Sequence, residues 1–177
     1  MPSRMSLEAY LAGAETTQPQ ELVWGILRQP PAPGYPHQIA VGRMFRRLDA
    51  HVRRLGAGQV VISPVDVILD RERALVVQPD IVFVSNQRLA ICTDRIWGAP
   101  DLVVEVLSGS NWRHDRGDKL DWYRTYGVRE CWLFDPPERR VEVFNLAGVS
   151  APSRYERGQR IRSDVLPRLR VRPDDVA

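Results

Sequence analysis

Glu105 is the residue whose presence is hardest to explain by packing alone. It lies in the run LVVEVL, residues 102–107, in which every other side chain is apolar. Such a run is typical of a strand that is covered on both faces. An unpaired carboxylate in an apolar interior is costly, so it must be neutral, paired, hydrogen-bonded or bound to a metal ion. Glu105 is therefore either half of a buried salt bridge with an arginine or a functional carboxylate.

Asp80 is a second carboxylate at the start of a strand. It follows Pro79 and precedes the apolar run IVFV, residues 81–84. The proline restricts the backbone where the strand begins and so limits the direction of the carboxylate. Taken alone, an aspartate at this place is often only a turn residue. Neighbouring strands are only about 4.8 Å apart, however, so Asp80 and Glu105 on two such strands can share one hard cation, Mg²⁺ or Mn²⁺.

Lys119 follows the Glu105 strand on a segment with helical character, residues 115–126. The simpler interpretation is a surface lysine that pairs with Asp115 four residues earlier, a contact worth a few tenths of a kcal/mol. The alternative is an amine that faces the two carboxylates, because a short loop returns this helix across the end of the strand. Glu21 and His37 are weaker candidates for further polar contributions. Asp101 is about 13 Å from Glu105 along the strand and is interpreted as a strand-entry or cap residue.

The elements that position these residues alternate between helical and extended patterns. Within residues 37–55, apolar side chains recur at three- and four-residue steps, which predicts a helix with one buried face. Further helices are expected at 5–13 and 115–126, and strands at 21–28, 60–62, 65–69, 75–77, 81–84, 102–107, 130–135, 140–146 and within 154–163. This order predicts an α/β fold, a mixed β-sheet flanked by helices. We expect a single domain over 1–177, with a core at 5–170 and a loose tail at 171–177.

The bulk composition is that of a globular protein. Of the 177 residues, 44% are hydrophobic and 27% are charged, and 25 basic and 22 acidic side chains leave a net charge of +3. This excess is too small to indicate nucleic-acid binding by itself, although arginines crowd residues 43–54, 113–116 and 154–172. The two cysteines lack paired or metal-like spacing and no signal peptide is evident, so a cytoplasmic location is expected. No apolar run approaches the roughly 18–20 residues that cross a bilayer.

At these residues the sequence resembles a known family. The segments ELVWGILR, PHQIAVGRMFRRLDAHV, QPDIVFV and APDLVVEVLSGSNWRHDRGDKLDWYRTYGVRECWLFDPPERRVEVF are similar to the Uma-type restriction endonuclease family of the PD-(D/E)XK nuclease-like superfamily, over residues 5–170. The resemblance implies a restriction-endonuclease-like core, with Asp80 as the first metal aspartate and Glu105 as the second acid. The lysine usual two residues later would fall at Leu107, and Lys119 takes its place. Glu21 and His37 match supporting positions.

These observations lead to three hypotheses about function. The first is a Mg²⁺- or Mn²⁺-dependent endonuclease that hydrolyses nucleic-acid phosphodiester bonds, with DNA the expected substrate and catalytic residues Asp80, Glu105 and Lys119. Arg113 and Arg116 are then candidates for contacts to the nucleic-acid backbone, and a homodimer is plausible because cutting two strands suits two-fold symmetry. The second is a non-catalytic nucleic-acid-binding module that retains the fold. The third is a metal-dependent enzyme that acts on another phosphate ester.

Overall fold

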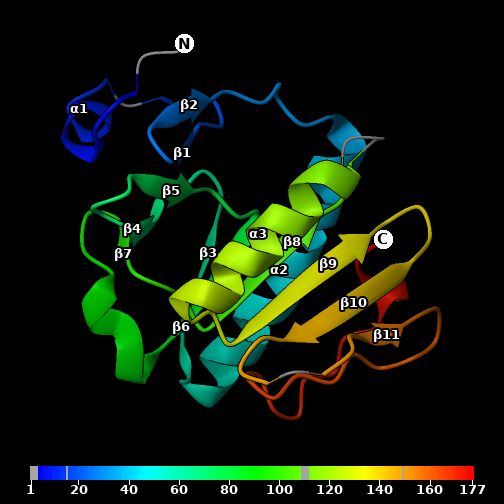
Figure 1. Cartoon of the computed structure of the whole chain (residues 1–177). Coiled ribbons are helices and arrows are strands. Elements are labelled where there is room, and N and C mark those ends of the chain that lie inside the picture. The colour runs from blue at the N-terminus through cyan, green and yellow to red at the C-terminus, as the bar shows by residue number, and fades with distance from the viewer. Residues whose placement is uncertain (1–3, 15, 109–111, 149) are drawn as a thin grey trace.

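Two β-sheets flanked by helices make up the fold (Figure 1). The computed structural model describes the chain except for residues 1–3, 15, 109–111 and 149 and the side chains of 112–116. The larger sheet has six strands in the order β11-β10-β9-β8-β6-β3, of which only the β8–β9 pair is parallel among the described residues. Its strands are β3 (Gly58–Ile62), β6 (Ile81–Ser85), β8 (Leu102–Val106), β9 (Glu130–Asp135), β10 (Arg140–Asn145) and β11 (Ser153–Tyr155).

The smaller sheet has five strands in the order β2-β1-β5-β4-β7. These are β1 (Glu21–Val23), β2 (Ile26–Arg28), β4 (Val67–Asp70), β5 (Leu75–Val77) and β7 (Ile96–Trp97). The short helix α1 (Leu7–Leu11) begins at Ser6, whose hydroxyl accepts a hydrogen bond from the Ala9 amide as an N-cap. The sequence did not predict β7, the 3₁₀ helix at Asn86–Ile91, or the division of the strands into two sheets.

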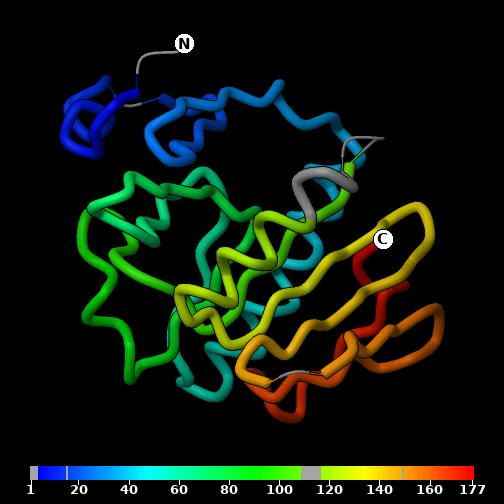
Figure 2. Tube along the Cα trace, viewed as in Figure 1, coloured from blue at the N-terminus to red at the C-terminus, as the bar shows by residue number. Residues whose placement is uncertain are grey.

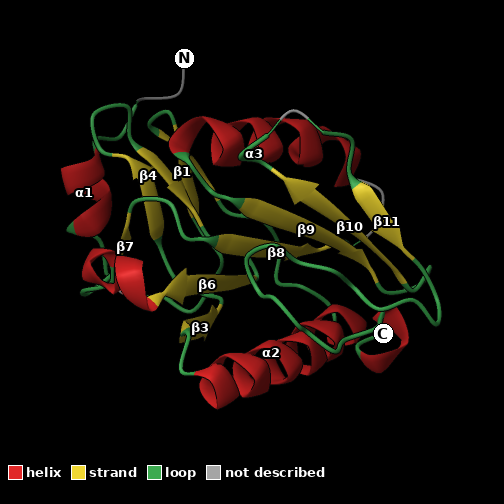
Figure 3. Cartoon of the chain, turned by 90° about the horizontal axis from the view of Figure 1, so that it is seen from below, coloured by secondary structure: helices red, strands yellow, loops and turns green. Residues whose placement is uncertain are grey.

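Two long helices cover opposite faces of the six-stranded sheet (Figure 3). Helix α2 (Tyr35–Leu55) starts with Pro36 in its first turn and ends at Gly56, whose φ of 58° is left-handed. Its apolar stripe is buried against alternate residues of the sheet, and these include Leu102 and Val104 of β8. Helix α3 (Trp112–Tyr126) packs on the other face, where Val103 lies. The mixed α/β fold class predicted from the sequence is therefore confirmed.

The prediction of one strand over residues 21–28 was wrong. The segment forms a hairpin in which Glu21 pairs with Arg28 and Val23 with Ile26. Trp24 and Gly25 form the two-residue turn, with φ values of 53° and 81°. Turns of this kind favour Asn-Gly because both residues need positive φ, so the pair Trp-Gly gave no signal. The Trp24 ring is held in place by an edge-on contact with Trp122 at 5.8 Å and by the Arg73 guanidinium at 4.4 Å.

The prediction of a loose tail over residues 171–177 was also wrong. Val171, Pro173 and Val176 are buried, and a 3₁₀ turn forms at Pro173–Asp175. Val171 and Val176 belong to the same apolar cluster as the buried stripe of α2. The trace from residue 160 onward, orange to red in Figure 2, stays against the body of the molecule. The error arose because this short tail is basic and then acidic and looks polar on average, although Val171, Pro173 and Val176 are buried.

Candidate functional site

The pairing of β6 with β8 places Asp80 and Glu105 opposite each other. The strands are antiparallel with Ile81 facing Val104, so one step further along the register sets Asp80 against Glu105. Residues opposite each other across such a pair have Cα atoms about 4.5–5.5 Å apart and side chains on the same face. One carboxylate oxygen of Asp80, Oδ2, accepts a hydrogen bond of 2.7 Å from the Val106 amide and is fixed at the strand end.

Helix α3 brings an amine and a hydroxyl to Glu105. Lys119 Nζ lies 3.2 Å from Glu105 Oε1, and the Tyr123 hydroxyl, one helical turn further on, donates to the same oxygen at 2.5 Å. Residues four apart lie on the same face of a helix, so both reach the strand together. Lys119 is the sole lysine among the 25 basic side chains of the chain. The ammonium group is a compact point charge with three donors, so it can contact both carboxylates at once.

Glu21 and His37 complete the cluster from the N-terminal elements. Glu21, on the smaller sheet, lies with Oε1 2.8 Å from Lys119 Nζ, so this lysine bridges two carboxylates that come from different sheets. His37, in the first turn of α2, has Nε2 3.0 Å from the Val106 carbonyl and 3.4 Å from Asp80 Oδ2. The peptide groups flanking Val106 are thus contacted by Asp80 on one side and by His37 on the other. The structure brings together all five residues that the sequence analysis named for this site.

The electrostatics of the cluster are those of buried carboxylates that repel one another. Burial raises the pKa of Glu105 to about 7, since the Lys119 charge and the Tyr123 hydrogen bond only partly offset burial and the nearby Asp80 and Glu21 charges. Burial opposes the charge on Lys119, but the carboxylates of Glu105 and Glu21 outweigh it and raise the pKa of the amine. Lys119 therefore stays protonated at neutral pH. Burial likewise opposes charge on His37, yet Asp80 and the Val106 carbonyl produce a net rise in its pKa.

A chain of hydrogen bonds connects the site to the smaller sheet through Gln78, two residues before Asp80. The backbone N–H of Gln78 donates to Glu21 Oε1 at 3.1 Å, and the side-chain nitrogen Nε2 of Gln78 donates to Asp66 Oδ1 at 2.8 Å. Asp66 in turn accepts from the Tyr10 hydroxyl at 3.0 Å and from Arg95 at 3.2 Å. Glu21 is held by this chain as well as by its own strand, so the smaller sheet contributes to the site directly.

Asp101, Arg113 and Arg116 do not belong to the described cluster. Asp101 is buried away from the cluster, where it accepts from the Ser85 amide at 2.7 Å and pairs with Arg129 at 3.3 Å, as a strand-entry residue should. The side chains of Arg113 and Arg116 lie outside the described residues. Tyr123 and Gln78 were missed by the sequence analysis. The four-residue step from Lys119 to Tyr123 was the signal that could have identified the tyrosine.

The donor set can be compared with what a hard cation requires. Within the described residues no group of three or more His, Cys, Asp or Glu side chains is arranged to hold one metal ion. Asp80 and Glu105 form a two-carboxylate set, and each takes its hydrogen bonds from described residues on one oxygen, Oδ2 and Oε1 respectively. Mg²⁺ is commonly held by one or two carboxylates while waters and substrate phosphates supply the other ligands. The residues present fit this kind of ion.

Comparison with known proteins identifies the family. Residues 7–174 match the family model described as "Uma2: Putative restriction endonuclease". The chain belongs to this family. A solved structure described as a "putative nuclease belonging to DUF820" from Anabaena variabilis superposes with a TM-score of 0.81, at 18% identity and over 97% of each chain, which shows that the fold is shared. A search of curated proteins found no match. None of the helices in the described part of the chain is long and apolar enough to cross a membrane.

Proposed function

We propose that this Uma2-family protein is a metal-dependent endonuclease that hydrolyses phosphodiester bonds of nucleic acid, with DNA as the expected substrate. One observation carries the proposal. Asp80, Glu105 and Lys119, from β6, β8 and α3, converge at one strand end, with Lys119 Nζ 3.2 Å from Glu105 Oε1. Family membership and the shared nuclease-type fold support the same reaction class. Residues this costly to bury together are typical of functional sites.

Asp80 and Glu105 would hold Mg²⁺ or Mn²⁺. Such an ion, when bound, polarises a phosphate oxygen and lowers the pKa of a coordinated water. Hydrogen bonds within the protein hold the two carboxylates in position before an ion binds. The Val106 amide fixes Asp80, and the Tyr123 hydroxyl fixes Glu105. The oxygens that remain, Asp80 Oδ1 and Glu105 Oε2, receive no hydrogen bond from the described residues and are the ones proposed to face the cation.

Lys119 is proposed to stabilise negative charge on the phosphate. In hydrolysis a water oxygen bonds to phosphorus, the bond from phosphorus to the leaving oxygen breaks, and that oxygen takes up a proton. Negative charge accumulates on the phosphate oxygens during this step, and a pre-positioned cation stabilises it. Glu21, at 2.8 Å, keeps the amine charged and in place. Arg113 and Arg116 are proposed to contact the backbone of the bound nucleic acid.

The test is cleavage of supercoiled plasmid, single-stranded DNA and RNA with MgCl₂ or MnCl₂ and with chelator. We expect cleavage only with the metal, and a loss of at least about 100-fold in Asp80→Asn, Glu105→Gln and Lys119→Met. Asp121→Asn is the matched control, because Asp121 is an exposed carboxylate on the same helix as Lys119. Cleavage that survives all three site substitutions rules out this site. We also propose that two copies of the chain assemble as a homodimer on duplex DNA, and sedimentation of the complex measures this.

A second candidate function is a nucleic-acid-binding module without catalysis. The observation that favours it is that Lys119 already pairs with Glu105, and that no set of three metal-ligand side chains is found among the described residues. Calorimetry with MnCl₂ separates the two, because the nuclease requires binding that Asp80→Asn abolishes. Absence of metal binding combined with nucleic-acid affinity in chelator favours the module. Cleavage of small phosphodiesters but not of nucleic acid indicates an enzyme that acts on another phosphate ester.

A further inference from the structure

The charge of the molecule is concentrated in two segments that are far apart in sequence. Residues 35–55 and 160–177 hold ten arginines and four aspartates, a net charge of +6. The whole chain carries only +3, so the remaining residues, with 15 basic and 18 acidic side chains, carry −3. The small overall excess therefore hides a strongly basic region. We call this region, made by the outer side of α2 and the C-terminal segment 160–172, the basic face.

The arginines of α2 lie in two rows on its solvent side. Arg43, Arg47 and Arg54 are spaced by four and seven residues, so they follow one flank of the helix, and Arg46 and Arg53 follow a neighbouring line seven residues apart. All five are exposed, whereas the opposite stripe is buried in the core. The first row extends over eleven residues, which is about 16 Å along the helix axis.

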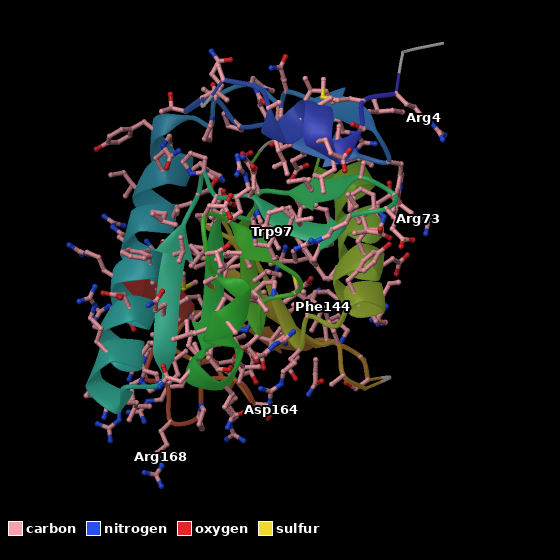
Figure 4. All side chains as sticks on the ribbon, turned by 90° about the vertical axis from the view of Figure 1, so that its left-hand side faces the viewer. Arg4, Arg73, Trp97, Phe144, Asp164 and Arg168 are labelled. Atoms are coloured by element: carbon pink, nitrogen blue, oxygen red, sulfur yellow. The ribbon has the colours of Figure 1, made fainter. Side chains whose placement is uncertain are left out.

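The C-terminal segment lies along the flank of α2 that carries the first row. The Pro167 carbonyl is 3.1 Å from His51 Nε2, Asp175 is 4.0 Å from Arg47, and the Ala177 carbonyl accepts a hydrogen bond from Arg43. The segment therefore runs antiparallel to the helix, on the same side of the large sheet (Figure 3). Figure 4 shows Arg168 extending outward at the end of the molecule where α2 finishes.

Alternation in the segment turns its arginines outward. The Ile161 amide donates to the Val171 carbonyl at 2.9 Å, and both side chains are buried together with Leu169. The residues between these apolar positions are the exposed arginines at 160, 162, 168, 170 and 172. Within the described part of the chain no side-chain hydrogen bond or ion pair engages Arg46, Arg160, Arg162, Arg168 or Arg170. Their charge is therefore available to an external partner.

We infer that the basic face binds the sugar–phosphate backbone of a nucleic-acid duplex. Guanidinium groups match phosphate geometry, and rows of them on a rigid scaffold give affinity without sequence readout. A single strand is less suited, because such sites use several aromatic rings for base stacking, and among the described residues of the basic face Tyr35 is the one exposed aromatic side chain. A lipid surface is less suited, because the exposed residues of segment 160–172 are five arginines, Asp164 and Pro167, without a large apolar side chain that could anchor in a membrane.

The basic face deepens the proposed nuclease function and rests on it for its biological meaning. Helix α2 carries both features, because His37 in its first turn is 3.4 Å from Asp80 Oδ2 and Arg43 follows about 9 Å further along the axis. A duplex held on this helix is therefore next to the candidate site. The face contains no residue of the Asp80, Glu105 and Lys119 cluster, so binding and cleavage can be measured separately.

The test measures binding of a labelled DNA duplex to the whole chain in the presence of chelator. Binding is monitored by fluorescence anisotropy at several salt concentrations. The variant is Arg46→Ala/Arg168→Ala/Arg170→Ala, which removes three of the arginines without an internal partner. The control is Arg4→Ala/Arg71→Ala/Arg124→Ala, which removes the same charge from exposed positions elsewhere. Each phosphate contact contributes about 0.9 to the slope of log affinity against log salt, so the variant should lose about 2–3 in slope and at least about tenfold in affinity at 0.1 M salt.

The results of this test support or overturn duplex binding by the basic face. Equal losses in the variant and the control overturn the assignment to this face, as does a wild type that fails to bind duplex in chelator. Recovery of binding by the corresponding triple arginine-to-lysine variant supports the assignment and shows that the losses do not reflect misfolding. Tighter binding of single-stranded DNA or of anionic phospholipid vesicles overturns the choice of partner. If the protein binds duplex but does not cleave it, the basic face is supported and the nuclease proposal is wrong. If the protein cleaves and the variant binds duplex as tightly as the wild type, the nuclease proposal is supported and the basic face is wrong.

Discussion

Replacing Glu105 with glutamine should abolish cleavage and at the same time stabilise the fold above neutral pH. Glutamine has nearly the same shape as glutamate and keeps an oxygen that can accept from the Tyr123 hydroxyl, which is 2.5 Å away in the wild type. Lys119 is not left unpaired, because Glu21 remains 2.8 Å from its amine. What the substitution removes is a carboxylate whose side chain is only 15% exposed and whose charge the protein disfavours.

The magnitude follows from the pKa of Glu105. The folded protein raises this pKa from 4.5 to about 7, so the folded state binds the proton more tightly than the unfolded chain does. A group of this sign contributes stability that is complete below pH 4.5 and is lost as the pH rises through 7. One pKa unit corresponds to about 1.4 kcal/mol, so the wild type loses about 3 kcal/mol across this window. Glutamine has no proton to lose. The difference in the free energy of unfolding, Glu105→Gln minus wild type, should therefore be about 3 kcal/mol larger at pH 8.5 than at pH 4.5.

The assay is urea-induced unfolding of both proteins at pH 4.5, 5.5, 7.0 and 8.5, followed by circular dichroism. Glu138→Gln is the matched control, because Glu138 is exposed on the turn between β9 and β10, and its difference from the wild type should stay within about 0.5 kcal/mol. The reasoning fails if the difference between Glu105→Gln and the wild type is the same at pH 4.5 and pH 8.5. It also fails if the difference grows towards low pH, because Glu105 would then be a carboxylate stabilised by its partners.

Three further predictions concern residues around the site and the sheet. Tyr123→Phe should destabilise the fold by about 2 kcal/mol at pH 8.5 and by less at pH 5, because it removes a buried donor to the charged form of Glu105; unfolding at both pH values checks this. Lys119→Met should cost about 3 kcal/mol at pH 8.5 because it leaves Glu21 and Glu105 facing each other without a cation, and Lys119→Arg should restore part of that stability but not cleavage. Gly58→Ala should lower the free energy of unfolding by more than about 2 kcal/mol, since a Cβ there would lie 2.1 Å from the Val84 carbonyl oxygen. The control Gly56→Ala, whose Cβ would meet no atom within 4 Å, should lower it by about 1 kcal/mol, and thermal unfolding measures both.

The carboxylate pair could be predicted because strand geometry leaves few choices. A charged residue inside an apolar run must be compensated, and Asp80 at the start of another strand was the partner that the resemblance implied. That the two strands are antiparallel neighbours is what the structure adds. The long helix at 35–55 was equally predictable, since its apolar spacing, Pro36 and Gly56 all agree. In each case the information lies within about twenty consecutive residues, or in one strand pair.

Other parts of the fold and of the site depend on contacts between segments far apart in sequence. Nothing in residues 21–28 shows that the segment folds back at Trp24, because the ring contacts that hold this turn come from Arg73 and Trp122. The C-terminal segment is buried only because the flank of α2 is there to receive it. Tyr123 looks like an ordinary helical aromatic until β8 places Glu105 2.5 Å from its hydroxyl. Propensity and periodicity cannot supply contacts of this kind.

In the proposed site, Lys119 supplies from a helix the amine that the resemblance places on the strand. Where the resemblance leads one to expect a strand lysine, Leu107 packs instead with the apolar cluster under α3. An amine on α3 needs a second anchor to face Glu105, since a long side chain on a helix is otherwise free to reach solvent. Glu21 provides that anchor from the smaller sheet, and Gln78 and Asp66 hold Glu21. The smaller sheet thus supplies the second contact that a lysine on α3 needs in the proposed site, and removing Glu21 should free Lys119 even though both proposed metal carboxylates remain.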